Sequence, residues 1–162
     1  MAIAAYVGLG ANLGDAPQTL RSALAALGTI PQTRVSRRSS LFVSAPVEAE
    51  GNDFINAVAR LDTELAPDAL LTELQKIERT FGRERPFRNA PRTLDLDLLI
   101  YDQLESYSPT LELPHPRMSA RAFVLLPLLE LDPDIRIPGK GPAKDYLPAV
   151  ADQDIKPLPE QY

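Results

Sequence analysis

Cysteine and tryptophan are absent from the 162 residues of this chain, and histidine occurs once. Without cysteine the chain can form neither a disulfide framework nor a thiolate metal site. Basic residues are also in deficit, 17 against 22 acidic ones, which gives a formal net charge of -5. Generic nucleic-acid binding needs a surplus of lysine and arginine, so we expect no nucleic-acid partner.

We expect no targeting or membrane-spanning segment at the N-terminus. Its first ten residues, MAIAAYVGLG, contain no basic leader and are too short for a signal core or a membrane span. We therefore expect a soluble, cytoplasmic protein without a membrane partner. Hydrophobic residues make up 44% of the chain, so it can bury a substantial core, and its length predicts a single domain over residues 1–162.

The order of hydrophobic patterns along the chain predicts strand, helix, strand, strand, helix, strand. This order is typical of the split βαβ motif. The predicted fold class is therefore α+β, with a ferredoxin-like βαββαβ core in which an antiparallel sheet carries helices on one face. The strands are expected at residues 2–9, 33–43, 54–61 and 93–101, and the helices at residues 17–27 and 67–81.

Beyond this core the sequence predicts short C-terminal helices and an irregular proline-rich tail from Pro133 onward. Pro127 is expected to start a new helix, because proline in a helix interior removes a hydrogen bond. Between the first strand and the first helix, GLGANLGD has the composition of a turn. It lacks the GK[ST] of a P-loop and the spacing of GxGxxG, so the pattern alone does not predict a nucleotide loop.

The last predicted strand carries two acidic residues, in the run RTLDLDLLIYD. Strand side chains alternate, so Asp95 and Asp97 point to one face with their Cα atoms roughly 7 Å apart. Two carboxylates in this arrangement can bind one or two Mg²⁺ ions together with substrate phosphates and water. The pair alone is equally compatible with two solvated acids on a half-exposed strand.

Arginines cluster directly before this acidic pair, in the segment GRERPFRNAPR. Guanidinium groups bind phosphate oxygens through two parallel hydrogen bonds, and a loop with glycine and proline can close over a substrate. An acid pair beside such a loop predicts a polyphosphate site. The alternative is a solvated basic loop that offsets nearby acids. The arginines are Arg83, Arg85, Arg88 and Arg92.

Two further groups of residues have the chemistry of a binding site. Phe54 and Asn56 share one face of a predicted strand, where an aromatic wall beside an amide suits a flat heterocycle. His115 lies between two prolines that restrict its backbone, and Arg121 follows it, so both could reach a phosphate. The same residues also fit a core phenylalanine with an edge asparagine, and a histidine in a surface turn.

Four segments, in this order, resemble the 6-hydroxymethyl-7,8-dihydropterin pyrophosphokinase family of folate biosynthesis: GLGANLGD, FINAVA, IERTFGRERPFRNAPRTLDLDLL and LPHPRMSARAFVLLPLLELDP. The resemblance extends from about residue 3 to residue 135, and PRTLDLDLL is its most specific part. It implies a ferredoxin-like monomer that transfers the β,γ-pyrophosphoryl group of ATP to the hydroxymethyl oxygen of the reduced pterin and releases AMP.

The resemblance also implies roles for the residues at matching positions. Asp95 and Asp97 would bind two Mg²⁺ ions, and Arg83 and Arg92 would be the principal arginines of a closing catalytic loop. The pterin would contact Ser44, Val47, Phe54, Asn56 and Phe123. The co-substrate ATP would contact Gln75, Glu78, Arg85, Arg88, Arg92, His115 and Arg121, and the backbone of Leu98.

Three other functions stay open on the sequence. Another magnesium-dependent nucleotidyl or phosphoryl transferase could use the same acids and arginines, although Phe54, Asn56 and Phe123 favour a flat pterin. A non-enzymatic RNA-binding module would need an aromatic sheet motif that this acidic chain lacks. A catalytically inactive relative is disfavoured because the acid pair is intact.

Asn89 stands where the family commonly has an aromatic residue, often tryptophan, in the stretch RNAPR. We expect Asn89→Trp to change the rate of loop closure or product release more than the affinity for the pterin, because such a loop covers the substrate. Pre-steady-state kinetics set beside equilibrium pterin binding measure the two effects. Unchanged transient rates would contradict this expectation.

Overall fold

The structure is a computed structural model, and it describes residues 2–45, 53–82 and 94–159. The predicted order of strands and helices is confirmed, except that the strand expected at residues 33–43 divides in two. Both parts pair with the same neighbour, β4. The elements are β1 (Ile3–Ala11), α1 (Ala16–Leu27), β2 (Thr33–Arg38), β3 (Phe42–Ser44), β4 (Phe54–Thr63), α2 (Pro67–Gly82) and β5 (Asp95–Tyr101).

Within the described residues, six strands form one antiparallel sheet in the order β10-β3-β4-β1-β5, with β2 also paired to β4. The central strand β1 is hydrogen-bonded to β4 on one side and to β5 on the other. The edge strand β10 (Ile155–Pro157) comes from the C-terminal segment and pairs with β3. No helix in the described ranges is long and apolar enough to cross a bilayer.

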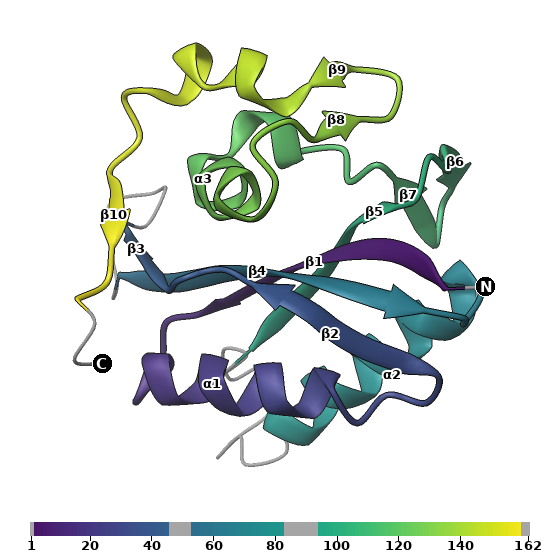
Figure 1. The fold of residues 1–162 in the computed structure, drawn as a ribbon. Coiled ribbons are helices and arrows are strands. Elements are labelled where there is room, and N and C mark those ends of the chain that lie inside the picture. Colours follow the sequence, from purple (N-terminus) through teal and green to yellow (C-terminus); the bar gives the residue numbers. More distant parts are fainter. Residues whose placement is uncertain (1, 46–52, 83–93, 160–162) are drawn as a thin grey trace.

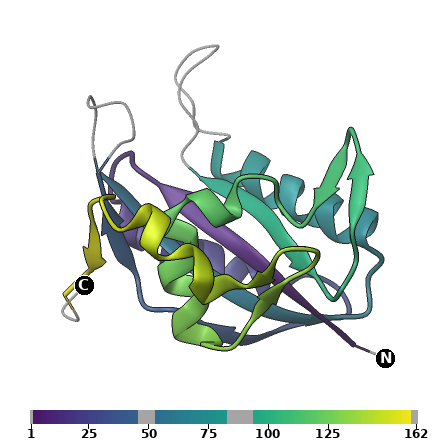
Figure 2. The same cartoon turned by 90° about the horizontal axis from the view of Figure 1, so that it is seen from above.

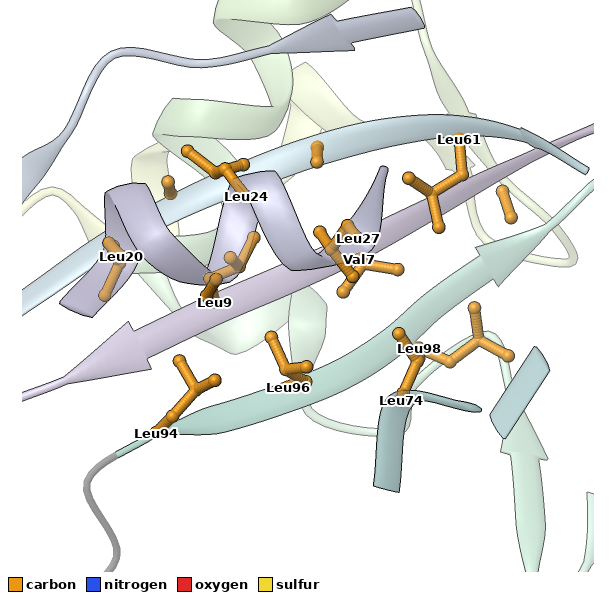
Figure 3. Packing of buried hydrophobic residues seen from close by; sticks show 14 of the residues in the cluster. Val7, Leu9, Leu20, Leu24, Leu27, Leu61, Leu74, Leu94, Leu96 and Leu98 are labelled. Atoms are coloured by element: carbon orange, nitrogen blue, oxygen red, sulfur yellow. The ribbon is translucent and has the colours of Figure 1, made fainter. Parts of the chain in front are cut away.

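Helices α1 and α2 cover one face of the sheet, the lower face in Figure 1. Their apolar stripes pack against the alternate side chains of β1, β4 and β5 that point to this face, as the strand period requires. Figure 3 shows Leu20 and Leu27 of α1 against Val7 and Leu9 of β1. Helix α1 begins where the Asp15 carboxylate accepts a hydrogen bond from the Gln18 N–H at 3.3 Å.

The opposite face of the sheet is covered by α3 (Ala122–Leu131) and by the C-terminal segments, as seen from above in Figure 2. Here Tyr6, Val58 and Leu99 of the sheet form a second core cluster with Leu125 and Leu128 of α3. The sheet is therefore buried on both faces along part of its length. Beside the start of α3, part of this face of the sheet stays accessible.

Pro127 lies inside α3, so the prediction that it starts a new helix is wrong. Proline in a helix interior costs about 3 kcal/mol, because one backbone hydrogen bond is lost. Leu125 and Leu128, on either side of it, are fully buried. Each buried leucine stabilises the fold by about 1.5–3 kcal/mol. Burial of the helix against the sheet therefore offsets the local cost of the proline.

The C-terminal segment is more regular than the irregular tail expected from its prolines. Its apolar residues Ile135, Ile137 and Val150 are buried against α3, which holds short elements in place. The segment also supplies β10 to the main sheet. The remaining short elements are the hairpin β6 (Ser106–Ser108) with β7 (Leu111–Leu113), the pair β8 (Arg136–Ile137) with β9 (Gly141–Pro142), and the 3-10 turns η1 (Met118–Ala120), η2 (Ala143–Tyr146) and η3 (Pro148–Val150).

Leu74 tests the packing of α2 on the sheet, because its side chain is fully buried. Leu74→Ala leaves a cavity, so we expect the free energy of unfolding to fall by about 2–5 kcal/mol. The control is Leu104→Ala at a side chain that is 39% exposed, where we expect about 1 kcal/mol or less. Urea denaturation measures both values. Equal losses in the two variants would contradict this arrangement.

Candidate active site

A pocket of about 310 Å³ opens on the face of the sheet that carries α3. This volume is at the lower end of the range found for small-molecule sites, about 300–1,000 Å³. Its walls come from β1, β3, β4, β5 and the start of α3. Residues that are far apart in the sequence and were predicted to act together line this one pocket: Ser44, Phe54, Asn56, Asp95, Asp97, Arg121 and Phe123.

The floor of the pocket is formed by two glycines of the central strand. Gly10 lies opposite Asn56 on β4 and opposite Asp95 on β5, and Gly8 lies opposite Asp97. A Cβ atom at Gly10 would stand 3.5 Å from Asn56 Oδ1. The lack of side chains on β1 therefore keeps open the space between the acid pair and the amide.

Neither glycine was predicted from the sequence to lie at the site, yet both line the pocket. Gly8 falls within the strand expected at residues 2–9, whereas Gly10 was expected in the turn GLGANLGD; β1 instead continues through Gly10 to Ala11. The available signal was the alternation of Gly8 and Gly10 with buried Val7 and Leu9. Glycine at every second position of a strand marks a face that another group approaches closely.

Asp95 and Asp97 lie on the pocket face of β5, while Leu94, Leu96 and Leu98 are buried on the other face. The predicted alternation is confirmed. In the described part of the chain no three His, Asp or Glu side chains converge in a metal-binding group. Two carboxylates at the edge of an open pocket fit Mg²⁺, which binds proteins through one or two carboxylates and completes its octahedron with waters and substrate phosphates.

Asn56 lies across β1 from the acid pair. It is only 3% exposed, and its Nδ2 donates to Ser44 Oγ at 2.7 Å. The pairing of β3 with β4 places Ser44 opposite Phe54 on the same face. Strand pairing therefore positions the hydroxyl that orients the amide, and the amide is available to recognise a ligand edge with a defined donor and acceptor direction.

Two phenylalanines and an arginine complete the pocket. Phe54 and Phe123 are half-buried and reach it from the sheet and from α3. The guanidinium carbon of Arg121 lies 5.3 Å from the centre of the Phe123 ring, a cation–π contact. This contact places a positive charge beside the aromatic wall, in the pocket that the acid pair also lines.

His115 adjoins this charged end without lining the pocket itself. Its backbone N–H donates to Leu99 O at 2.9 Å, and its Nδ1 accepts from the Arg117 N–H at 3.1 Å. The neutral ring therefore carries its proton on Nε2. Burial lowers the pKa of His115, the Asp97 carboxylate opposes this shift, and the guanidinium of Arg121 adds to it. The imidazole is therefore neutral at pH 7 and can donate one hydrogen bond.

The predicted ATP residues on α2 and on the core face of β5 lie apart from the pocket. Gln75 is exposed on α2, and the Leu98 side chain is buried in the core. The Glu78 carboxylate accepts a hydrogen bond from the Leu96 N–H at 2.8 Å. It therefore ties α2 to the edge strand between the two aspartates. That these residues contact ATP stays a prediction.

The remaining predicted site residues lie outside the described residues, so their proposed contacts with pterin and ATP stay predictions. They are Val47, Arg83, Arg85, Arg88 and Arg92. The described part of the site already combines an acid pair, an arginine and an aromatic pocket with a fixed amide. This combination indicates an enzyme that transfers phosphoryl groups to a flat small molecule.

Comparison with known sequences identifies the family. The model of the 7,8-dihydro-6-hydroxymethylpterin-pyrophosphokinase family matches residues 6–133. The chain belongs to this family. It is 44% identical to the 2-amino-4-hydroxy-6-hydroxymethyldihydropteridine pyrophosphokinase of Pseudomonas aeruginosa, over 95% of this chain and 96% of the relative. The protein of the same name from Haemophilus influenzae is 38% identical, over 94% of this chain and 96% of the relative.

Comparison with solved structures shows the same fold. The crystal structure of Plasmodium falciparum HPPK-DHPS wild type with pteroate superimposes with a TM-score of 0.74 at 11% identity. The match covers 94% of this chain and 45% of the solved chain. The HPPK-DHPS solved in complex with substrates gives a TM-score of 0.72, with 43% of its chain covered. This chain therefore spans less than half of these solved chains.

The contact between Glu78 and the Leu96 N–H is open to a direct test. Glu78→Ala removes the acceptor, so we expect amide hydrogen exchange at Leu96 to accelerate about ten-fold. Glu78→Gln keeps an acceptor oxygen and should preserve most of the protection. As a control, Glu73→Ala removes a carboxylate of the same helix that pairs with Lys76. Equal exchange rates at Leu96 in all variants would show that Glu78 does not hold β5.

Proposed function

We propose that this pocket is where the chain performs the reaction of its family, the transfer of the β,γ-pyrophosphoryl group of ATP to 6-hydroxymethyl-7,8-dihydropterin. The acceptor is the pterin hydroxymethyl group, the other product is AMP, and the step belongs to folate biosynthesis. The observation that carries the assignment of the pocket is one row across the sheet, in which Asp95, Gly10 and Asn56 lie opposite one another. This row connects the acid pair, which would bind metal and phosphate, to Asn56, which would bind the heterocycle.

The pterin occupies the end of the pocket next to Asn56. Its ring lies between Phe54 and Phe123, because stacked aromatic faces favour a flat heterocycle. Asn56 recognises the amide and amino edge of the pterin, and its orientation follows from the hydrogen bond to Ser44 at 2.7 Å. The family resemblance adds Val47 to the proposed pterin contacts. This placement directs the hydroxymethyl group toward Asp95 and Asp97.

The acid pair would hold Mg²⁺, and the family resemblance leads us to expect two ions. When bound, such ions neutralise the phosphate charge and polarise the acceptor hydroxyl. Arg121 binds phosphate oxygens from the side of Phe123. The neutral His115 donates a hydrogen bond from its Nε2–H to another phosphate oxygen. These groups stabilise charge on the departing AMP without forming a covalent bond to the protein.

The arginine-rich segment contributes the second set of phosphate contacts. Arg83 and Arg92 bind ATP as the loop closes and excludes water, which protects the nucleotide from hydrolysis. On the nucleotide side we place Gln75, Glu78, Arg85, Arg88 and the backbone of Leu98.

The core topology, the location in the cell and the oligomeric state are inferred in the same way. We infer a ferredoxin-like core, supported by the antiparallel strand order β3-β4-β1-β5 with α1 and α2 on one face. A cytoplasmic monomer is the state expected from the sequence. Both the location in the cell and the monomeric state stay predictions. Analytical ultracentrifugation tests the oligomeric state.

The reaction is tested by measuring AMP formed from ATP, with and without 6-hydroxymethyl-7,8-dihydropterin, in Mg²⁺ or in EDTA. We expect AMP only when both the pterin and Mg²⁺ are present. AMP formed with Mg²⁺ but independently of the pterin would indicate a different phosphoryl or nucleotidyl transferase that uses the same acids. AMP formed in EDTA would contradict the metal role of the acid pair.

Asp97 provides the sharpest single substitution. Asp97→Ala removes half of the proposed metal site, and metal assistance is worth several kcal/mol, so we expect turnover to fall roughly 10²–10⁴-fold. The fold should persist, because Asp97 lies on the pocket face of β5 and not in the core. Asp68→Ala, on the exposed first turn of α2, is the control. Near-normal turnover by a folded Asp97→Ala protein would exclude the metal role.

A further inference from the structure

The Gln153 side chain bridges the two residues on either side of Arg121. Its Oε1 accepts a hydrogen bond from the Ala122 N–H at 2.9 Å, and its Nε2 donates to Ala120 O at 2.9 Å. Both ends of the amide are used, so the side chain cannot rotate without breaking both bonds. Gln153 therefore clamps the backbone from which Arg121 and Phe123 project into the pocket.

Helix α3 needs this acceptor because its own N-cap supplies none. The N-cap residue is Arg121, which makes no side-chain capping hydrogen bond. The first N–H groups of a helix have no partner within the helix and must find one elsewhere. Arginine carries only donors. A residue 31 positions further along the chain thus caps the helix, and Arg121 keeps its guanidinium for the pocket.

The residues that follow Gln153 hold the opposite wall. Asp154 O accepts from the Ala45 N–H at 3.1 Å, and Ile155 is paired with Ser44. Ser44 in turn holds Asn56. In Figure 1 the C-terminal segment, drawn in yellow, descends from above α3 and runs beside β3 as β10. Consecutive residues of one segment therefore connect the α3 wall to the β3 wall.

The space between the two walls is hollow. A second pocket of about 550 Å³ adjoins the first and shares Ser44, Arg121 and Phe123 with it. Gln153 and Ile155 line this second pocket as well. Phe123 and Ile155 pack against the second core cluster, and the hydrogen bonds of Gln153 add a polar link between the α3 wall and the C-terminal segment beside this hollow.

We propose that Gln153 is a positioning residue of the pterin pocket, which acts through the placement of Phe123 and Arg121. This inference rests on the pterin site proposed above. The two hydrogen bonds of Gln153 hold the backbone beside Phe123 in place before the ligand arrives, so that binding does not have to order it. The C-terminal segment is thus part of the active site, although its residues need not touch the substrate.

The test is calorimetric titration with 6-hydroxymethyl-7,8-dihydropterin, in Mg²⁺ and a nonhydrolysable ATP analogue, well below the thermal midpoint of each variant. We expect Gln153→Ala to weaken pterin affinity about ten-fold, because two hydrogen bonds are lost. Gln103→Ala, at an exposed turn, is the matched control and should bind like the wild type. If Gln153→Ala does not fold, Gln153→Glu keeps the acceptor for Ala122 but loses the donor, and should also weaken binding.

A double-mutant cycle separates positioning from a general loss of structure. In a Phe123→Ala background the clamp has no aromatic ring to place, so Gln153→Ala should change pterin affinity less than about two-fold. A ten-fold loss of pterin affinity in that background, or normal pterin binding by Gln153→Ala itself, would overturn the positioning role of Gln153. Either result would leave the proposed pterin pocket standing. Normal pterin binding by Phe123→Ala would instead overturn the proposed pocket, and the role of Gln153 with it.

Discussion

The pairing of the central strand β1 with β4 and β5 is the constraint on which the whole site depends. It places Gly10 between Asp95 and Asn56, and Gly8 beside Asp97. A slip of one residue would turn every side chain of a strand to the other face. The acids would then point into the leucine core, and the leucines into the pocket. Register therefore decides whether this chain can bind its substrates at all.

The two faces of β1 serve different purposes, and the core secures the register for the site. Val7, Leu9 and the other alternate residues pack against α1 and α2, as Figure 3 shows for α1. A slip in the register of β1 would expose these side chains and lose the free energy of their burial. Gly8 and Gly10 on the opposite face contribute nothing to packing at the pocket, but they leave its floor free of side chains. Stability and access are thus assigned to opposite sides of the same strand.

The upper walls are held by longer-range contacts. Helix α3 starts at the pocket without a capping side chain of its own, and the C-terminal segment supplies Gln153 to it and β10 to the sheet. The Arg121 and Phe123 wall and the Ser44 wall thus depend on residues that follow the family match, which ends at residue 133. These polar contacts add to the apolar packing of Phe123 and Ile155 against the second core cluster, beside the hollow between the walls.

Much of this protein followed from the sequence by itself. Alternation in LDLDLL determined that Asp95 and Asp97 share a face, and helical periods with prolines and glycines at their ends determined α1 and α2, because these patterns are local. Tertiary structure alone decided the rest. Gly10 was expected in a turn but lies in a strand, since pairing on both sides of β1 overrides local preference. Pro127 is tolerated in α3 because burial compensates for it. Gln153 meets Ala120 and Ala122, on either side of Arg121, only because the folded tail returns to the sheet, and no local pattern encodes the hydrogen bond to Ala122, 31 residues away.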